Sequence, residues 1–205
     1  MSNSLLAMDV PSVLGLRACL LCGGKSRRMG RDKSLIPHPL GGSWLSHSIG
    51  LCRRLDLPVD VVSSISSHHQ LASRFDGVEC RPDSFPGQGP LAALSAVFGQ
   101  ENVLASLVLP VDMPWLESWV LIQLIRAWQE QPSLAVLSHD STHLQPLFAI
   151  YPNDSIYRET LLRQLADHRL SMHDWLGRVP YRLLALPKGA LRNVNCPADL
   201  VTLNE

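Results

Sequence analysis

The stretch LRACLLCGGKSRRMGRDK, residues 16–33, decides the fold class of this chain. Its first seven residues, 16–22, are apolar apart from one arginine, and the double glycine Gly23-Gly24 follows them directly. A short apolar run bounded by glycines is typical of a buried strand. We therefore expect a buried strand over residues 16–22, with a polar, glycine-containing loop at its carboxyl end.

Strand and helix patterns alternate along the rest of the chain. Further strands are expected at residues 59–64, 105–111, 133–137, 147–151 and 181–186, with a polar loop over 138–145. Helices are expected at residues 44–55, 91–98 and 156–168, around the apolar stripe Leu121, Leu124, Ile125 and Trp128, and from Pro197 onward. This alternation predicts a three-layer αβα domain with a mostly parallel sheet. We expect one domain over residues 1–205, in which residues 1–14 form a short disordered extension.

Composition limits the kind of partner that the chain can bind. Lysine plus arginine and aspartate plus glutamate number 18 each, so the net charge is zero. Without a broad basic field, nucleic acid and anionic membranes are poor candidates, and a small substrate is favoured. No apolar run reaches the ~20 residues that a transmembrane helix needs. The 5 cysteines are an odd number in a chain of this size, which fits a reducing compartment, and we expect a cytoplasmic protein.

The loop segment, residues 21–33, contains 3 glycines and 5 basic residues. Glycines let the backbone approach phosphates, while lysine and arginine offset the charge of a triphosphate and of departing pyrophosphate. Gly24-Lys25-Ser26 also matches the end of a P-loop, but that motif needs a glycine where Cys19 stands inside the apolar strand. A dinucleotide-binding fingerprint cannot be laid over these glycines either.

The same segment resembles the L-x-G-G-x-S-x-R-M-G-x-D-K signature of the molybdenum cofactor guanylyltransferases, the MobA family of nucleotidyltransferases. The matching residues are Leu21, Gly23, Gly24, Ser26, Arg28, Met29, Gly30, Asp32 and Lys33, with Cys22 where the family usually has alanine. Later blocks of the family are matched by Asp83 with 87–91, by residues 110–114, by 145–148 and by 193–200. The resemblance thus runs in order over most of the chain.

This resemblance implies a fold, a reaction and a set of site residues. The fold would be like that of nucleotide-diphospho-sugar transferases, with a Rossmann-like nucleotide-binding half. The reaction would transfer GMP from GTP to molybdenum-molybdopterin, release pyrophosphate and form the molybdopterin guanine dinucleotide cofactor. The expected nucleotide-binding residues are Leu21, Cys22, Gly23, Gly24, Lys33, Ser63, Asp83 and Asp112. The expected catalytic residues are Lys33, Asp112, Arg28 and Lys25.

Asp112 is the expected magnesium ligand. It follows an apolar strand, at the edge where an open parallel sheet binds its ligands. Mg²⁺ prefers carboxylate, phosphate and water oxygens, so one aspartate can help to hold it once a triphosphate is bound. The alternative is an aspartate that only caps a turn between Pro110 and Pro114.

Several alternatives stay open at this point. Ser64 could replace Ser63 as the nucleoside contact, or both could belong to a simple polar loop. Other activities to consider are a cytidylyltransferase of the same pathway, another small-molecule nucleotidyltransferase, a P-loop-type kinase or ATPase, and a noncatalytic GTP-binding adaptor. Transient contacts with cofactor-synthesis or acceptor enzymes are also open. The histidine pairs His68-His69 and His139 with His143 lack the spacing of a structural zinc site, and no zinc is expected.

Overall fold

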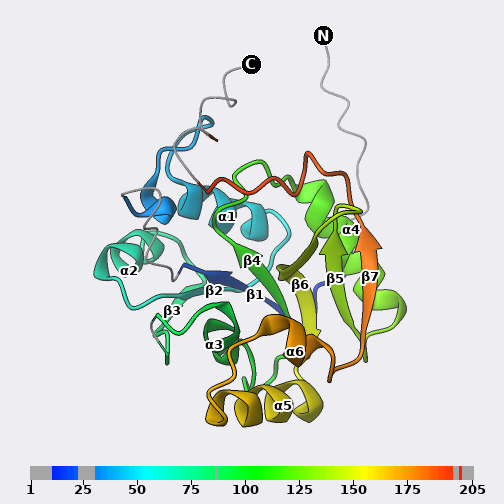
Figure 1. Cartoon of the computed structure of the whole chain (residues 1–205). Coiled ribbons are helices and arrows are strands. Elements are labelled where there is room, and N and C mark those ends of the chain that lie inside the picture. Colours follow the sequence, from blue (N-terminus) through cyan, green and yellow to red (C-terminus); the bar gives the residue numbers. More distant parts are fainter. Residues whose placement is uncertain (1–10, 23–30, 86, 196–198, 200–205) are drawn as a thin grey trace.

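A computed structural model of the chain describes residues 11–22, 31–85, 87–195 and 199. Strands of this part form one 7-stranded sheet in the order β3-β2-β1-β4-β6-β5-β7 (Figure 1). The strands are β1 (Leu16–Leu21), β2 (Val59–Val62), β3 (Val78–Arg81), β4 (Ala105–Pro110), β5 (Ala135–His139), β6 (Leu144–Pro152) and β7 (Tyr181–Ala185). Strand β6 is antiparallel to β4 and β5, and the other pairings are parallel. The predicted mostly parallel sheet is confirmed.

Helices cover both faces of this sheet, as expected for three layers (Figure 1). One apolar core lies against α1 (Trp44–Arg53), α2 (Ser66–Ala72) and α4 (Ser118–Glu130). The other lies against α3 (Pro90–Leu94), α5 (Ser155–Ala166) and α6 (Met172–Leu176). Two short 3-10 helices, η1 (Lys33–Leu35) and η2 (Ser95–Val97), complete the described helical elements. The three-layer prediction is confirmed.

The sequence explains the best-defined elements locally. In β1, Ala18 and Leu20 face one core while Cys19 and Leu21 face the other, which is the alternation of a strand buried on both sides. The apolar stripe expected in α4 is buried against the first core, as the 3.6-residue period requires. Helix α5 begins after Asp154, whose carboxylate accepts a hydrogen bond from the Ile156 N–H at 3.1 Å.

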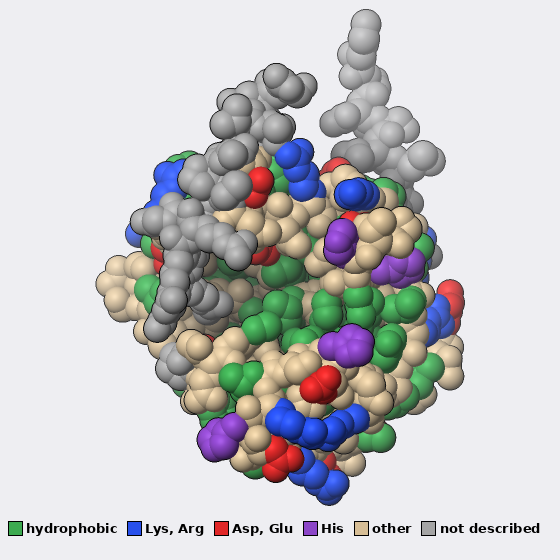
Figure 2. All heavy atoms as spheres, viewed as in Figure 1, with side chains coloured by type: hydrophobic (Ala, Val, Ile, Leu, Met, Phe, Trp, Pro, Cys, Tyr) green, Lys and Arg blue, Asp and Glu red, His purple; other side chains and the backbone are tan. Residues whose placement is uncertain are grey.

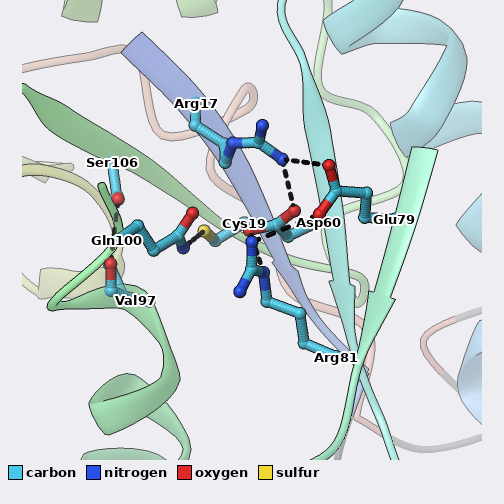
Figure 3. A network of polar contacts seen from close by, with 8 residues as sticks. All are labelled: Arg17, Cys19, Asp60, Glu79, Arg81, Val97, Gln100 and Ser106. Carbon is cyan, nitrogen blue, oxygen red and sulfur yellow. Dashed lines mark hydrogen bonds and ion pairs between the residues drawn. The ribbon is translucent and has the colours of Figure 1, made fainter. Parts of the chain in front are cut away.

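A polar network joins the neighbouring strands β1, β2 and β3 (Figure 3). Asp60 of β2 is fully buried, and its two carboxylate oxygens accept hydrogen bonds from Arg17 Nη1 at 2.7 Å and Arg81 Nε at 2.6 Å. Glu79 joins the same arginines at 3.4 Å and 3.2 Å but is largely exposed. The buried Asp60 carboxylate of β2 is thus paired with one arginine from β1 and one from β3. This pairing favours the observed register of the three strands.

The structure differs from the expectations in several places. Helices α2 and α6 and strand β3 had no predicted counterpart, because each has only 4 to 7 residues and shows little periodicity. The predicted loop 138–145 shrinks to 140–143, because β5 continues to His139 and β6 begins at Leu144. The helix expected from Pro197 lies outside the described residues.

The described N-terminal residues contact the rest of the fold. Of the expected extension 1–14, residues 11–14 are described; the Ser12 carbonyl accepts a hydrogen bond from Gln129, and Val13 packs on the first core. Within the described ranges, no helix has the length and apolar character to cross a membrane.

Candidate active site

The site forms at the carboxyl edge of the parallel strands. Strands β1 and β4 lie next to one another, with Leu21 in register with Pro110, so the segments that follow them leave the sheet side by side. Strands β2 and β3 run parallel to β1 and end at the same edge. Residues 22, 63, 83 and 112 all follow these strand ends, which is where an open α/β sheet places its ligands.

Lys33 and Asp112 meet at this edge. The Lys33 ammonium lies 3.1 Å from Asp112 Oδ2 and donates a second hydrogen bond to Asn195 Oδ1 at 2.9 Å. The side chains of Lys33 and Asp112 are 15% and 26% exposed, so the pair is shielded but still reachable from solvent. The backbone supports the contact, because Val194 N–H donates to the Asp112 carbonyl at 2.9 Å. Lys33, the last residue of the loop segment, therefore lies beside Asp112 at the carboxyl edge of the sheet.

Asp32 caps the turn that carries Lys33. Its Oδ1 accepts a hydrogen bond from the Ser34 N–H at 2.9 Å, which makes it the N-cap of η1. Its Oδ2 lies 2.6 Å from Nε2 of His68, a fully buried residue of α2. On the other side of the ring, His68 Nδ1 lies 2.8 Å from Ser63 Oγ. The end of the loop segment is thereby joined to the end of β2.

The two expected nucleoside contacts occupy different environments. Ser63 is fully buried, and its hydroxyl contacts His68 and accepts from the Ile65 N–H at 3.1 Å, while Ser64 is exposed. Asp83 is half-buried two residues after β3, and its Oδ1 accepts from the Phe85 N–H at 2.9 Å. Both residues sit beside the edge, with Ser63 engaged in the fold and Asp83 holding a turn.

Leu21 and Cys22 lie at the carboxyl end of β1, beside the site. Both side chains are buried, and Cys22 N–H donates to the Val62 carbonyl at 3.1 Å. Burial raises the pKa of the Cys22 thiol far above its usual range, so this side chain stays protonated and packs as a small apolar group. The other expected loop residues, Gly23, Gly24, Lys25 and Arg28, lie outside the described residues.

A polar cavity of about 520 Å³ lies near this edge. It is lined by Asp140, His143, Leu144, Gln145, Lys188, Gly189, Leu191, Arg192 and Asn193. Asn193 Nδ2 donates to Gln145 Oε1 at 3.4 Å, so two of the segments that carry the family resemblance meet in its wall. Asn193 is two residues from Asn195, which holds Lys33.

In the space-filling view, apolar side chains gather over β4, β6 and β5, in a hollow between the helix layers (Figure 2).

The donor set around Asp112 fits one kind of metal binding. No group of three or more histidine, cysteine, aspartate or glutamate side chains in the described part of the chain could form a closed metal site. Mg²⁺ is commonly bound by one or two carboxylates together with substrate phosphates and water. A single, partly exposed carboxylate at a ligand-binding edge therefore fits a magnesium ion that arrives with a triphosphate.

A mostly parallel sheet with polar side chains gathered at its carboxyl edge defines the class as a ligand-binding α/β domain. Comparison with known families identifies it further, since the MobA-like NTP transferase domain matches residues 18–180. The chain therefore belongs to the MobA-like NTP transferase family.

Individual relatives match over nearly the whole chain. A protein of Rhodopirellula baltica, named "Probable molybdenum cofactor guanylyltransferase", is 37% identical over 98% of this chain and 97% of its own length. A protein of the same name from Pelotomaculum thermopropionicum is 31% identical, covering 89% of this chain and 88% of its own. The crystal structure of molybdopterin-guanine dinucleotide biosynthesis protein A from Archaeoglobus fulgidus has the same fold, with a TM-score of 0.70 at 21% identity, over 91% of this chain and 95% of that one.

Three residues of the site had no predicted role. Asn195 accepts a hydrogen bond from the Lys33 ammonium. Asp32 and His68 stabilise the turn that carries Lys33. Asn195 and Asp32 both belong to segments that resemble family blocks, so those blocks were the available signal. His68 carried no such signal, because its contacts depend on how α2 packs beside the loop segment.

Proposed function

We propose that this chain transfers GMP from GTP to molybdopterin that carries molybdenum, and releases pyrophosphate. The observation that carries the proposal is the meeting of Lys33, Asp112 and Asn195 at the carboxyl edge between β1 and β4. Membership of the MobA-like family supports nucleotidyl transfer, and the names of the two relatives support guanylyl transfer to this acceptor.

The proposed reaction is a single displacement at the α-phosphorus of GTP. A terminal phosphate oxygen of the acceptor forms a bond to that phosphorus, and the bond to the oxygen bridging the α- and β-phosphates breaks. Both electrons of the broken bond leave with pyrophosphate, so no covalent enzyme intermediate is needed. The protein then contributes positioning and charge stabilisation.

Lys33 is suited to offset the negative charge of the triphosphate. It is held by two side chains on a capped turn, so its ammonium is placed before substrate arrives and little ordering is needed on binding. Lys25 and Arg28 of the glycine-rich segment would assist the departing pyrophosphate. Their role rests on the family signature and on their charge.

Asp112 would hold magnesium together with the phosphates of GTP. The ion, once bound, would neutralise charge on the phosphate oxygens and orient them for displacement. Asp112 also pairs with Lys33, so one carboxylate would place both the metal and the lysine beside the same phosphates.

The polar cavity of about 520 Å³ is the proposed acceptor side. Lys188 offers a cation for the acceptor phosphate, and Gln145 with Asn193 offers amide groups for the pterin. Its wall reaches Asn193, two residues from the Lys33 contact, so an acceptor in this cavity would lie near the α-phosphate.

The direct test is pyrophosphate release with each of the four nucleoside triphosphates, with and without molybdenum-loaded molybdopterin. We expect release that requires both GTP and the acceptor. Release of inorganic phosphate or ADP from ATP would identify a kinase or ATPase instead, and GTP binding without turnover would identify an adaptor.

A further inference from the structure

His68 is a buried histidine to which the proposed chemistry assigns no role. It is fully buried in the first turn of α2, and both ring nitrogens contact polar side chains from other segments. Nε2 lies 2.6 Å from Asp32 Oδ2, and Nδ1 lies 2.8 Å from Ser63 Oγ. A histidine with two such partners is held in one orientation and links them.

The hydrogen bonds have a direction that satisfies every group. Ser63 Oγ accepts from the Ile65 N–H at 3.1 Å, which leaves its O–H to donate to His68 Nδ1. The ring proton is then on Nε2 and is donated to the Asp32 carboxylate. The hydrogen bond from Ser63 therefore fixes the tautomer of His68, so that Nε2–H donates to Asp32.

Ser63, at one end of this series of hydrogen bonds, is anchored in the sheet. Ser63 N–H donates to the Arg81 carbonyl of β3 at 2.9 Å, and His69 Nε2 lies 2.7 Å from the Ser63 carbonyl. Because Ser63 is fully buried, its hydroxyl cannot act as a nucleophile on a substrate, so this serine, histidine and aspartate do not form a hydrolytic triad. These three side chains instead hold Asp32 in a fixed orientation.

The Asp32 end controls the turn that carries Lys33. Asp32 uses Oδ2 for His68 and Oδ1 for the Ser34 N–H, so both oxygens are fixed on either side of the turn. Lys33, the next residue, reaches Asp112 and Asn195 from this turn. Without His68, the carboxylate of Asp32 could rotate and the turn would lose one of its two restraints.

We propose that His68 is a positioning residue that acts through Asp32 to place the Lys33 ammonium for triphosphate binding. The inference rests on the proposed function for the ligand, but the placement of Lys33 is a property of the free protein. It can therefore be tested separately from turnover.

The test uses two polar substitutions of different reach. In His68→Gln the amide nitrogen extends about as far as Nε2 and can still donate to Asp32. In His68→Asn the amide extends only about as far as Nδ1, so it can meet Ser63 but not Asp32. We expect GTP affinity, measured by calorimetry, to fall about three- to tenfold in His68→Asn and to stay within about twofold of wild type in His68→Gln.

A double-mutant cycle with Lys33→Ala shows whether His68 acts through the lysine. We expect His68→Asn to cost no further GTP affinity once Lys33 is alanine, because residues that act as one unit are not additive. The control is Gln164→Leu, which removes another fully buried polar side chain and its 2.7 Å hydrogen bond to the Ser171 carbonyl in the α5 region. It should leave GTP affinity unchanged, and a thermal melt reports its effect on stability. Additive losses in the cycle would overturn the proposal.

An arm without nucleotide separates this inference from the proposed function. The chain has three lysines, Lys25, Lys33 and Lys188, so ε-carbon-labelled lysine gives an NMR spectrum that single substitutions can assign. We expect His68→Asn to shift the Lys33 signal while Lys188 stays in place, and His68→Gln to restore the wild-type position. An unchanged Lys33 signal in His68→Asn would overturn the inference. If wild-type protein fails to bind GTP, the proposed function fails while this spectrum still decides the role of His68.

Discussion

At the scale of single residues, Asp112 is the side chain on which the proposed chemistry depends most. Its carboxylate lies 3.1 Å from the Lys33 ammonium, and its side chain is 26% exposed. We expect Asp112→Asn to stay folded but to lose most turnover, since a neutral amide is a poor ligand for Mg²⁺ and a weaker partner for the lysine. Turnover should be measured across a magnesium titration, beside a thermal melt. Full activity at limiting magnesium would remove Asp112 from the metal site.

Lys33 should matter for binding more than for folding. We expect Lys33→Ala to weaken GTP binding by about 1.5 to 3 kcal/mol, the usual contribution of a hydrogen bond to a charged group. Isothermal titration calorimetry measures this directly, and the melting temperature should change little because the side chain lies at the edge of the fold. An unchanged GTP affinity in this variant, with a large loss in Lys25→Ala, would favour a P-loop-type site.

The position of Asp112 could be predicted because the strand ends of a parallel sheet meet at one edge. Its contact with Lys33 could not, because the loop signature contains the lysine but does not say which side chain the lysine meets. The place of Ser63 could not be predicted to the same degree. A one-residue change at the end of a strand turns a side chain from the ligand edge into the fold, and Ser63 faces inward while Ser64 is exposed. The role of His68 depends on tertiary packing, which local sequence does not encode.

At the scale of elements, Asp60 stabilises the register of the neighbouring strands β1, β2 and β3. Its buried carboxylate joins Arg17 of β1 to Arg81 of β3, and those arginines are 20% and 35% exposed. We expect Asp60→Ala to lower the free energy of unfolding by about 2 to 3 kcal/mol, less than for a fully buried pair because both arginines can turn to water. Urea denaturation measures the loss.

Glu79→Ala is the matched control for this network. Glu79 contacts the same two arginines but its side chain is 58% exposed, so the loss should stay below about 1 kcal/mol. Equal losses in the Asp60 and Glu79 variants would mean that burial of the carboxylate is not what gives the network its strength.

Element lengths also explain which parts of the fold were predictable. Strand β1 and helix α4 have strong apolar patterns over 6 and 13 residues, and both were predicted. Helix α2 begins Ser-Ser-His-His and strand β3 has four half-buried or exposed residues, so neither shows a clear period. Such short elements form because the neighbouring strands and helices already provide a surface to pack on.

At the scale of the whole molecule, the order of the strands in the sheet could not be predicted from local sequence patterns. Strand β6 lies between β4 and β5 and runs against both, although it follows β5 in the sequence. A hydrophobic pattern shows that a strand is buried but not which neighbour it pairs with. The alternation of strands and helices was enough to predict the layers, and the position of Asp112 after an apolar strand was enough to predict the edge that carries the site.

The measurement that tests the central claim most directly is competition among GTP, CTP and ATP for transfer to molybdenum-loaded molybdopterin. A guanine presents donors at N1 and N2 and an acceptor at O6, so a site built to bond them leaves polar groups unpaired against cytosine or adenine. Discrimination of about 10⁴ is attainable on that basis. We expect GTP to be preferred strongly, with pyrophosphate as the second product; a preference for CTP, or no turnover with any triphosphate, would contradict guanylyl transfer.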